Sequence, residues 1–338
     1  MIYLWQQKQW QQIWHAKQQD RLPHALLLTG IKGVGKAEFA DAFARAMLCQ
    51  QVTAAGECCN HCRACRLAAN HTHPNILRVV PEKSGAAIKV DQIREVSDFI
   101  AQSALQGEYK IVIITKADDM NINASNALLK TLEEPSSNSL LILVSDQLER
   151  LPATILSRCQ RILFPRPSHG EALTWLENKL NDAAIDANLL LQLAEGAPLA
   201  ALALQKNDVL SVRKLLFDTI CILNQGKMDP IKSASNLQSM DILLFIDFNL
   251  SFITDLLRLQ LKISNEVIIN KDYVSQLHAL RDHYSMQASM NFMNELSTLR
   301  KQACVGINFN KQLLMENVLV KWMGGEQQSN KNKEAICS

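Results

Sequence analysis

The stretch Ala25–Ala37, ALLLTGIKGVGKA, decides the fold of this chain. Its first five residues predict a buried strand. Gly30, Gly33 and Gly35 then permit a tight turn, because glycine adopts backbone angles that other residues resist. Apolar residues follow at helical spacing: Phe39, Ala40, Phe43, Ala46 and Met47. A strand, a glycine-rich turn and a helix in this order predict a phosphate-binding loop, where backbone N–H groups and the helix N-terminus attract phosphate.

The loop lacks one group that a nucleotide-hydrolysing site needs. Gly30-x4-Gly35-Lys36 matches the Walker pattern up to its last position, where a Ser or Thr hydroxyl normally holds Mg²⁺. Ala37 stands at that position, and a methyl group cannot bind a metal ion. The sequence therefore predicts a degenerate nucleotide loop made of Gly30, Gly33, Gly35, Lys36 and Ala37. Weak binding of ATP or ADP without Mg²⁺ stays open, because the glycines and the lysine are present.

The length of 338 residues predicts two or three domains. A formal net charge of +2 does not by itself indicate a nucleic-acid-binding protein. The most apolar window, Ile242–Leu257, contains Asp247, Asn249 and Asp255, so it does not predict a membrane span. The N-terminus lacks a basic start followed by an apolar block, so we expect no signal peptide. These features predict a cytoplasmic protein without membrane association.

Cysteines cluster shortly after the helix that follows the loop. Nine cysteines are present, and four lie between Cys58 and Cys65, which favours metal binding in a reducing cytoplasm over a disulfide framework. Cys59, Cys62 and Cys65 form a double C-x2-C spacing, and Cys49 lies ten residues before Cys59. Four thiolates are the ligand set of a closed tetrahedral zinc site with no position for water. We therefore expect a structural Zn²⁺ at these four cysteines.

Other ligand sets stay open from the sequence. Cys58 is an alternative to Cys59 as the second ligand, although only Cys59 gives two even steps along the chain. His61, His71 and His73 can each replace a cysteine as ligand. Free buried thiols and an iron–sulfur cluster are the two interpretations without zinc.

The residues up to Phe164 alternate between strands and helices. Short apolar runs predict strands, and apolar residues at helical spacing predict helices. The expected strands are Ile76–Val80, Lys110–Thr115, Leu140–Val144 and Gln160–Phe164, and the expected helices are Val90–Ala104, Asn123–Pro135 and Leu151–Cys159. This alternation predicts a doubly wound α/β fold. Before the loop, Trp10 and Trp14 are four residues apart and predict a packing helix with both rings on one face.

The second half of the chain predicts helices only. Pro165 and Pro167 break the alternating pattern, and Ser168 with Glu171 forms a capping box that opens a new helix. The polar tail from Gly324 is expected to be disordered. The expected domains are 1–165, 166–207 and 208–323, followed by the tail 324–338.

Four motifs stand together in this chain. They are the loop Gly30–Ala37, the cysteine-rich insert after its helix, Asn126-Ala-Leu-Leu-Lys-Thr-Leu-Glu-Glu-Pro135 and Ser157-Arg158-Cys159. Jointly they resemble the bacterial clamp-loader AAA+ family of DNA polymerase III over nearly the whole chain. The resemblance implies an α/β, RecA-like P-loop AAA+ module at 1–165 with a zinc-binding insert at about 49–65, a helical lid at 166–207 and an all-α collar at 208–323.

The resemblance also implies where a motor subunit would carry its hydrolytic groups. Motor subunits place Asp-Glu directly after the third strand to hold Mg²⁺ and to activate water, whereas Thr115 and Lys116 stand here. Leu199 stands where they carry a lid arginine that senses the γ-phosphate. Asp118 and Asp119 follow shortly after, and we expect them to cap a helix or to form a surface pair. Together with the missing loop hydroxyl, these differences imply that the chain does not hydrolyse ATP.

Arg158 is the catalytic group that the chain retains. In the family, the arginine of Ser-Arg-Cys reaches the ATP of the neighbouring subunit, so Arg158 is implied to act in trans as an arginine finger. The alternative is a surface arginine that pairs with a carboxylate. The implied partners are the motor (gamma and tau) and delta subunits, with the sliding clamp and primer–template DNA reached through the complex. The implied role is that of a rigid, non-hydrolysing clamp-loader subunit in DNA replication.

Two other functions stay open from the sequence. An ATP-hydrolysing motor subunit would follow if a shifted strand register placed Asp118 and Asp119 at a metal site. A zinc-containing DNA-binding module would use the P-loop fold only as a scaffold and would show salt-dependent DNA affinity. The near-neutral charge argues against this second alternative.

Overall fold

The computed structural model divides the chain into two compact units, Met1–Leu202 and Ala203–Ser338. The described residues are 2–83, 85–101, 109–180, 182, 185–206, 208–264, 267–304, 307 and 309–323. The predicted disordered tail, 324–338, lies outside them. The finer division into a module, a lid and a collar stays a prediction.

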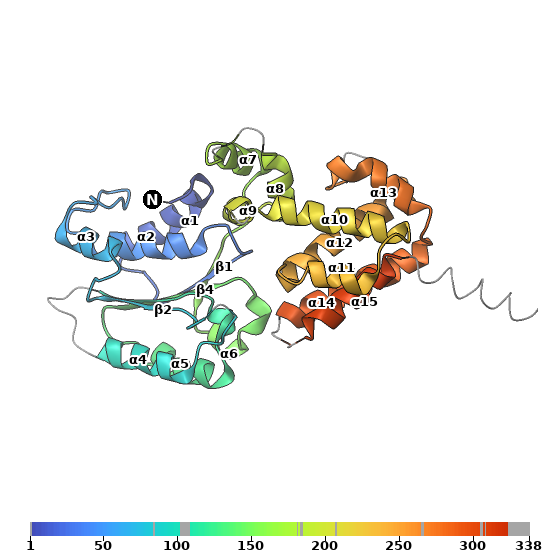
Figure 1. Ribbon diagram of the computed structural model, residues 1–338. Coiled ribbons are helices and arrows are strands. Elements are labelled where there is room, and N and C mark those ends of the chain that lie inside the picture. Colours follow the sequence, from blue (N-terminus) through green and yellow to red (C-terminus); the bar gives the residue numbers. More distant parts are fainter. Residues whose placement is uncertain are drawn as a thin grey trace, which may run out of the picture. The chain divides into compact units, whose positions relative to one another are not determined.

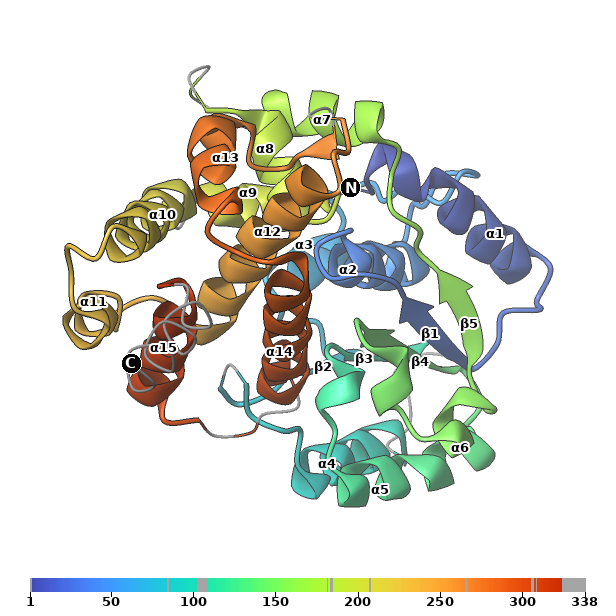
Figure 2. The same cartoon turned by 90° about the vertical axis from the view of Figure 1, so that its right-hand side faces the viewer.

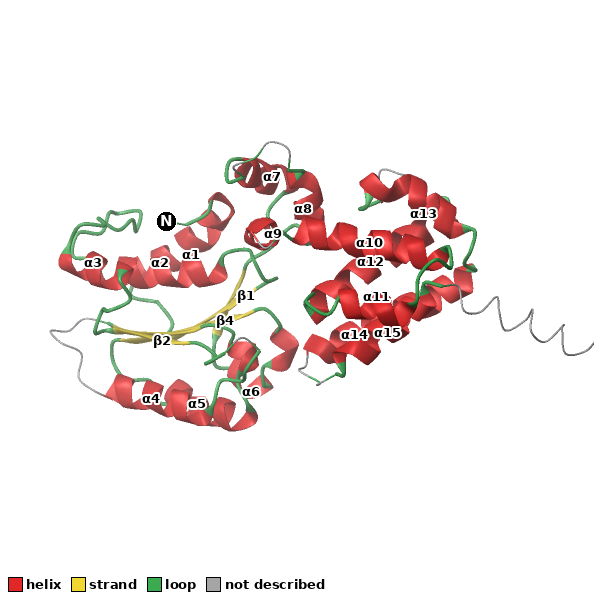
Figure 3. Ribbon diagram, in the orientation of Figure 1, coloured by secondary structure: helices red, strands yellow, loops and turns green. Residues whose placement is uncertain are grey.

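A parallel sheet of five strands forms the centre of the N-terminal unit (Figure 3). The strands are β1 (Ala25–Thr29), β2 (Ile76–Val79), β3 (Lys110–Ile114), β4 (Ser139–Ser145) and β5 (Gln160–Leu163). Their order is β2-β3-β4-β1-β5, and each neighbouring pair is parallel. Thr29 of β1 lies opposite Ser145 of β4, so the loops that follow these two strands leave the sheet side by side. The predicted α/β fold is confirmed.

Helices cover both faces of this sheet (Figure 1). One face carries α1 (Gln7–Gln18), α2 (Lys36–Leu48) and α3 (Arg63–Ala69), and the other carries α4 (Val90–Ala101), α5 (Ile122–Glu133) and α6 (Ala153–Leu156). Successive β1 side chains face opposite sides, as in any strand. Leu26 and Leu28 join the core under α1 and α2, whereas Ala25 and Leu27 join the core under α4 and α5. The strand is therefore buried on both sides, which explains its continuous apolar sequence.

Helix α1 packs through its tryptophans, as predicted. The rings of Trp10 and Trp14 are stacked with their centroids 6.3 Å apart, and both meet Phe43 of α2 edge-on. Their indole N–H groups donate to the carbonyl oxygens of Ala55 and Ala54, each at 2.9 Å. Because both rings are buried and both N–H groups are bonded, this helix fixes the cysteine-rich insert to the module.

The described residues after β5 contain helices and no strand. The helices are α7 (His169–Glu177), α8 (Ala187–Leu193), α9 (Pro198–Lys206), α10 (Val209–Asn224), α11 (Pro230–Asn236), α12 (Ile242–Gln260), α13 (Val274–Arg281), α14 (Met286–Cys304) and α15 (Lys311–Lys321). The predicted capping box of Ser168 and Glu171 is present at the start of α7. In the C-terminal unit, α12 packs against α13 and α14 (Figure 2). Within the described ranges, no single helix is long and apolar enough to cross a membrane, and α8 with α9 meets that criterion only as a pair bent by 109°.

A buried carboxylate organises the C-terminal unit. Asp255 of α12 is 0% exposed. It accepts the backbone N–H groups of Ile269 and Asn270 at 3.2 and 2.7 Å, and it pairs with Arg258 at 2.7 Å. These bonds tie the segment after α12 back onto the helix, and they satisfy the carboxylate away from water.

Replacement of Asp255 by alanine is expected to lower the free energy of unfolding by about 3 to 5 kcal/mol, because buried donors lose their acceptor. Asp282 pairs with Arg281 at the exposed surface, and Asp282→Ala is expected to change the free energy of unfolding by about 1 kcal/mol or less. Urea denaturation of both variants measures the difference. Equal losses would show that the Asp255 bonds do not stabilise this unit.

Candidate functional site

The phosphate-binding loop lies between β1 and α2, as the sequence predicts. Gly33 and Gly35 have φ angles of 84° and 90°, in the left-handed region that favours glycine. A Cβ on Gly33 would lie 2.6 Å from the Cβ of Ala200, and a Cβ on Gly35 would lie 2.6 Å from the ring of Tyr3. A larger residue at either position would therefore be disfavoured twice, by the backbone angle and by contact with a neighbouring residue.

The N-terminal segment Tyr3–Gln6 holds one side of the loop. The indole N–H of Trp5 donates to the carbonyl oxygen of Val34 at 2.9 Å. The Gln6 amide donates to the same oxygen at 2.9 Å and to that of Gly35 at 2.8 Å. Because Gln6 is completely buried, this contact is part of the folded core.

An aromatic cluster joins this segment to α7. Tyr3 and Trp5 are stacked with their centroids 4.8 Å apart, and Trp175 of α7 meets both rings edge-on at 5.5 and 5.6 Å. The sequence does not predict this contact, because Trp175 lies far along the chain and no spacing rule relates it to the N-terminus. The tryptophan-rich composition of residues 3–20 was the available signal.

Lys36 binds acceptors of its own chain. Its ammonium group donates to the carbonyl oxygens of Gly30 and Ile31 at 2.6 and 2.7 Å. A third bond, of 2.6 Å, joins it to the carboxylate of Asp146. An ammonium group carries three N–H donors, so these three acceptors satisfy all of them. Asp146 follows β4 directly, and the sequence analysis did not identify it, because the sequence does not reveal that β4 lies beside β1.

The end of β3 offers no carboxylate at the two positions where a motor subunit carries its acidic pair. The Thr115 hydroxyl donates to the carbonyl oxygen of Val79 on the neighbouring strand at 3.4 Å. Lys116 has a φ angle of 54° and begins the turn toward a short 3-10 helix, Ala117–Asp119. Thr115 and Lys116 are thus the two residues that directly follow β3.

Asp118 and Asp119 are used within the protein. Asp118 is buried and accepts the backbone N–H of Asp146 at 3.2 Å. Asp119 pairs with Arg150 at 3.0 Å. Burial raises the pKa of Asp118 above its usual value, and the nearby Asp146 and Asp119 carboxylates add to the rise. The expectation of a surface pair is met by Asp119 only, because Asp118 lies in the interior.

Leu199 lies beside the loop through its backbone. Its N–H donates to the carbonyl oxygen of Gly33 at 3.0 Å, at the start of α9. Leu199 therefore lies next to the loop, and its side chain is apolar.

The four predicted cysteine ligands come together in the insert. The sulfur atoms of Cys49, Cys59, Cys62 and Cys65 all lie within 4.8 Å of one another. The Cys59 sulfur is 3.6 Å from that of Cys49 and 3.9 Å from that of Cys65. A tetrahedral ion with metal–sulfur bonds of about 2.3 Å separates its sulfur ligands by about 3.8 Å. The cluster therefore has the dimensions of a four-thiolate metal site.

The alternative ligands do not belong to this cluster. Cys58 lies against the core, and burial raises the pKa of its thiol, which favours the protonated form. The ring nitrogens of His61 are bonded to the Cys59 carbonyl oxygen at 2.7 Å and to the Gln51 amide oxygen at 2.9 Å. The buried His73 accepts the backbone N–H of Asn75 through Nδ1. Cys59 is thus the cysteine that completes the set.

Arg158 is held by two elements of the module. One amino group donates to the Thr154 carbonyl oxygen at 3.0 Å and to the Ser157 hydroxyl at 3.3 Å. The other pairs with Glu133, the last residue of α5, at 2.6 Å. The side chain is 35% exposed. The ion pair of the surface-arginine interpretation is therefore present, and the guanidinium remains accessible.

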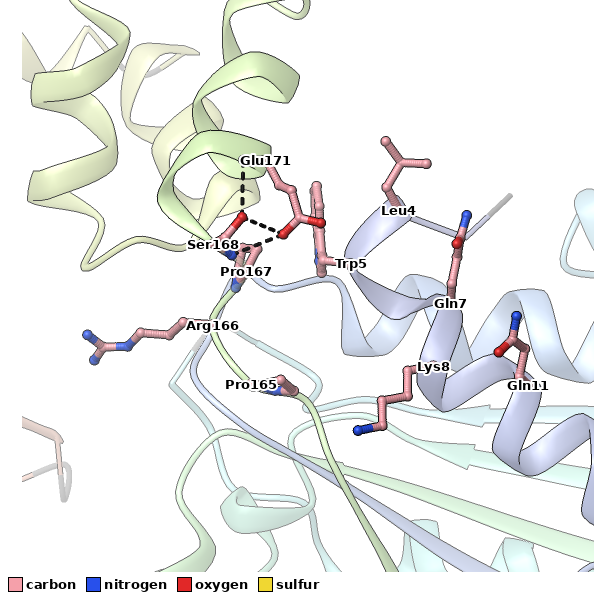
Figure 4. A pocket seen from close by; sticks show the side chains of 10 residues that line it. All are labelled: Leu4, Trp5, Gln7, Lys8, Gln11, Pro165, Arg166, Pro167, Ser168 and Glu171. Atoms are coloured by element: carbon pink, nitrogen blue, oxygen red, sulfur yellow. Dashed lines mark hydrogen bonds between the residues drawn. The ribbon is translucent and has the colours of Figure 1, made fainter.

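A surface pocket of about 420 Å³ lies between α1 and the segment that leads into α7 (Figure 4). Its polar groups include Ser168 and Glu171, which bond to each other in the capping box. Trp5, Pro165 and Pro167 form its apolar wall. The pocket does not include the loop residues or the cysteine cluster, so its lining does not indicate a catalytic site.

Comparisons with known proteins identify the family. Residues 5–168 match the family model described as DNA polymerase III, delta subunit, and residues 207–324 match the model of its C-terminal part. The delta' subunit of DNA polymerase III from Pseudomonas aeruginosa is 35% identical over 322 residues, which cover 95% of this chain and 97% of the relative. The chain belongs to the delta' family of DNA polymerase III subunits.

Further relatives agree with this assignment. The delta' subunit of Escherichia coli is 30% identical over 322 residues and 94% of each chain. The tau subunit of Bacillus subtilis is 28% identical over 278 residues, which cover 82% of this chain but 42% of tau. These two delta' proteins therefore match this chain over 97% and 94% of their own length, whereas tau extends well beyond the matched region.

Replacement of Gly33 by alanine is expected to lower the free energy of unfolding by about 1 to 3 kcal/mol more than Gly196→Ala. Both glycines have a positive φ angle, but only at Gly33 would the added Cβ meet a neighbour. Thermal unfolding of the two variants isolates the contact with α9. Equal losses would show that α9 does not constrain the loop.

Proposed function

We propose that this chain is the non-hydrolysing, delta'-type subunit of a bacterial clamp loader, which helps to place the sliding clamp on primed DNA during replication in the cytoplasm. Its membership of the delta' family supports the clamp-loading part of the proposal. The lack of hydrolysis rests on the residues of this chain.

The proposal rests mainly on the contacts of Asp118 and Asp119, the acidic residues that follow β3. Phosphoryl transfer to water needs a carboxylate that holds Mg²⁺ and a group that orients the water. One carboxylate oxygen of Asp118 accepts the backbone N–H of Asp146, and Asp119 forms an ion pair with Arg150. Because both carboxylates bond to groups of their own chain, they are poorly suited to hold Mg²⁺, which also disfavours the alternative of an ATP-hydrolysing motor.

Two further substitutions support the same conclusion. Ala37 gives the loop no hydroxyl for Mg²⁺. Leu199 gives α9 no cation for a γ-phosphate, although its backbone lies directly against Gly33. Because Ala37 lies in α2 and Leu199 lies in α9, this support does not depend on where β3 is taken to end.

Arg158 is proposed to act on the ATP of a neighbouring motor subunit. A guanidinium has five N–H donors, and Thr154, Ser157 and Glu133 accept three of them. Two donors therefore lack an acceptor among the described residues, and two are enough for a bidentate bond to phosphate. The three bonds within the chain would hold the guanidinium in position before it meets the neighbour.

The cysteine cluster is proposed to hold a structural Zn²⁺ through Cys49, Cys59, Cys62 and Cys65. A four-thiolate set leaves no coordination position for water or substrate. The ion would lock the insert, whose loop also binds α1 through Trp10 and Trp14. The proposed partners are the motor (gamma and tau) and delta subunits, with the clamp and primer–template DNA bound by the assembled loader.

Arg158→Ala is expected to slow ATP hydrolysis at the neighbouring site by about 10³-fold, the lower end of the range for arginine fingers. The measurement is single-turnover hydrolysis by a loader rebuilt with its motor and delta subunits and primed DNA. Arg94→Ala is the matched control, because Arg94 also pairs with a carboxylate at the surface, here Asp91.

Unchanged hydrolysis with Arg158→Ala, in a complex that assembles normally, would contradict the role in trans. An equal loss with Arg94→Ala would show that the effect comes from surface charge. Arg158→Lys is expected to restore little, because an ammonium group cannot form the bidentate bond.

The purified chain is expected to contain about one Zn²⁺ per molecule, measured by elemental analysis. Cys65→Ser is expected to lose the ion and to lower the melting temperature, whereas Cys58→Ser is expected to keep the ion. A folded wild-type chain without metal would contradict the zinc site, and loss of the ion with Cys58→Ser would contradict the ligand set.

A further inference from the structure

A partly buried ion pair joins Lys36 of the glycine loop to Asp146. Their atoms are 2.6 Å apart, and the two side chains are 2% and 26% exposed. Lys36 is the residue that contacts the terminal phosphates of a nucleotide in a working loop of this kind. Its charge is already neutralised by a carboxylate of the same chain.

Asp146 is held in place by its own strand and by a neighbour. The pairing of Thr29 with Ser145 sets the residue after β4 next to the loop after β1. Its backbone N–H donates to the buried carboxylate of Asp118 at 3.2 Å. The position of Asp146 is therefore fixed by the sheet and does not depend on the lysine alone.

The loop also keeps its shape without a ligand. Trp5 and Gln6 bind the carbonyl oxygens of Val34 and Gly35, and Leu199 binds that of Gly33. The first N–H groups of a helix have no acceptor within the helix itself, so the start of α2 retains donors for an anion. The backbone of a phosphate site is thus present, but its lysine, Lys36, is already paired with Asp146.

We propose that Asp146 is the internal ligand of this loop and excludes phosphate-bearing molecules by occupying Lys36. A phosphate group would have to displace the carboxylate, and it would then lie beside the displaced negative charge. The buried carboxylate of Asp118, which accepts the backbone N–H of Asp146, is a second acidic group beside Asp146. The proposal rests on the proposed function, since it explains why a non-hydrolysing subunit can keep a P-loop lysine.

The test is Asp146→Asn, which keeps the size of the side chain and removes its charge. The probes are inorganic pyrophosphate and ADP without Mg²⁺, measured by isothermal titration calorimetry on the full chain. Binding at least tenfold tighter than in the wild type is expected, because the lysine charge is then free for the anion. Adding Lys36→Ala to Asp146→Asn is expected to remove the gain.

Asp119→Asn is the matched control, because Asp119 lies at the same edge of the sheet but pairs with Arg150. It is expected to leave pyrophosphate and ADP affinity unchanged. Asp146→Ser serves as a second neutral variant should the asparagine variant not fold, and it is expected to give the same gain.

No gain in a folded neutral variant would overturn the proposal, and so would wild-type binding as tight as that of Asp146→Asn. An equal gain with Asp119→Asn would also overturn it, because the effect would then be one of general charge. Hydrolysis of ATP with Mg²⁺ is assayed separately on the same protein preparations. Turnover by the wild type would contradict the proposed function, whereas tighter binding without turnover supports the role of Asp146.

Discussion

The parallel pairing of β1 with β4 is the constraint on which the site depends. It brings the glycine loop and Asp146 to the same edge of the sheet, where Lys36 and Asp146 form a partly buried ion pair. In this register Thr29, the last residue of β1, lies opposite Ser145, the last residue of β4, so the residues that follow the two strands meet at one edge of the sheet. The core of the sheet thereby decides which carboxylate the loop lysine meets.

The module has the strand, glycine loop and helix of a nucleotide site, but the side chains of Lys36, Asp118 and Asp119 bond to other groups of the chain. The loop is braced by Trp5, Gln6 and Leu199, all of which bond to its carbonyl oxygens. These bonds come from two separate segments, so the loop is held without a ligand. Under the proposed function, the partly exposed Arg158 of the same module would supply a guanidinium to the ATP of a neighbouring subunit.

Local patterns in the sequence predicted much of this structure. The loop, the strands and most of the cysteine set follow from spacing and composition over short stretches, so Gly33, Lys36 and Cys62 could be placed in advance, whereas the choice of Cys59 over Cys58 stayed open. Asp146 and Trp175 could not, because their roles depend on strand order and on contacts between distant segments. Asp118, expected either to cap a helix or to form a surface pair with Asp119, is buried and accepts the backbone N–H of Asp146, a contact that depends on the order of the strands.

The most direct test of the central claim is Mg²⁺-dependent ATP hydrolysis by the purified chain, with Lys36→Ala as background. The account predicts no turnover above that background, because Thr115 and Lys116 follow β3 and the nearby Asp118 and Asp119 carboxylates bond to groups of their own chain. Turnover that requires Mg²⁺ and disappears with Lys36→Ala would contradict it. The chain would then be a motor in its own right, and its metal ligands would have to be sought elsewhere in the module.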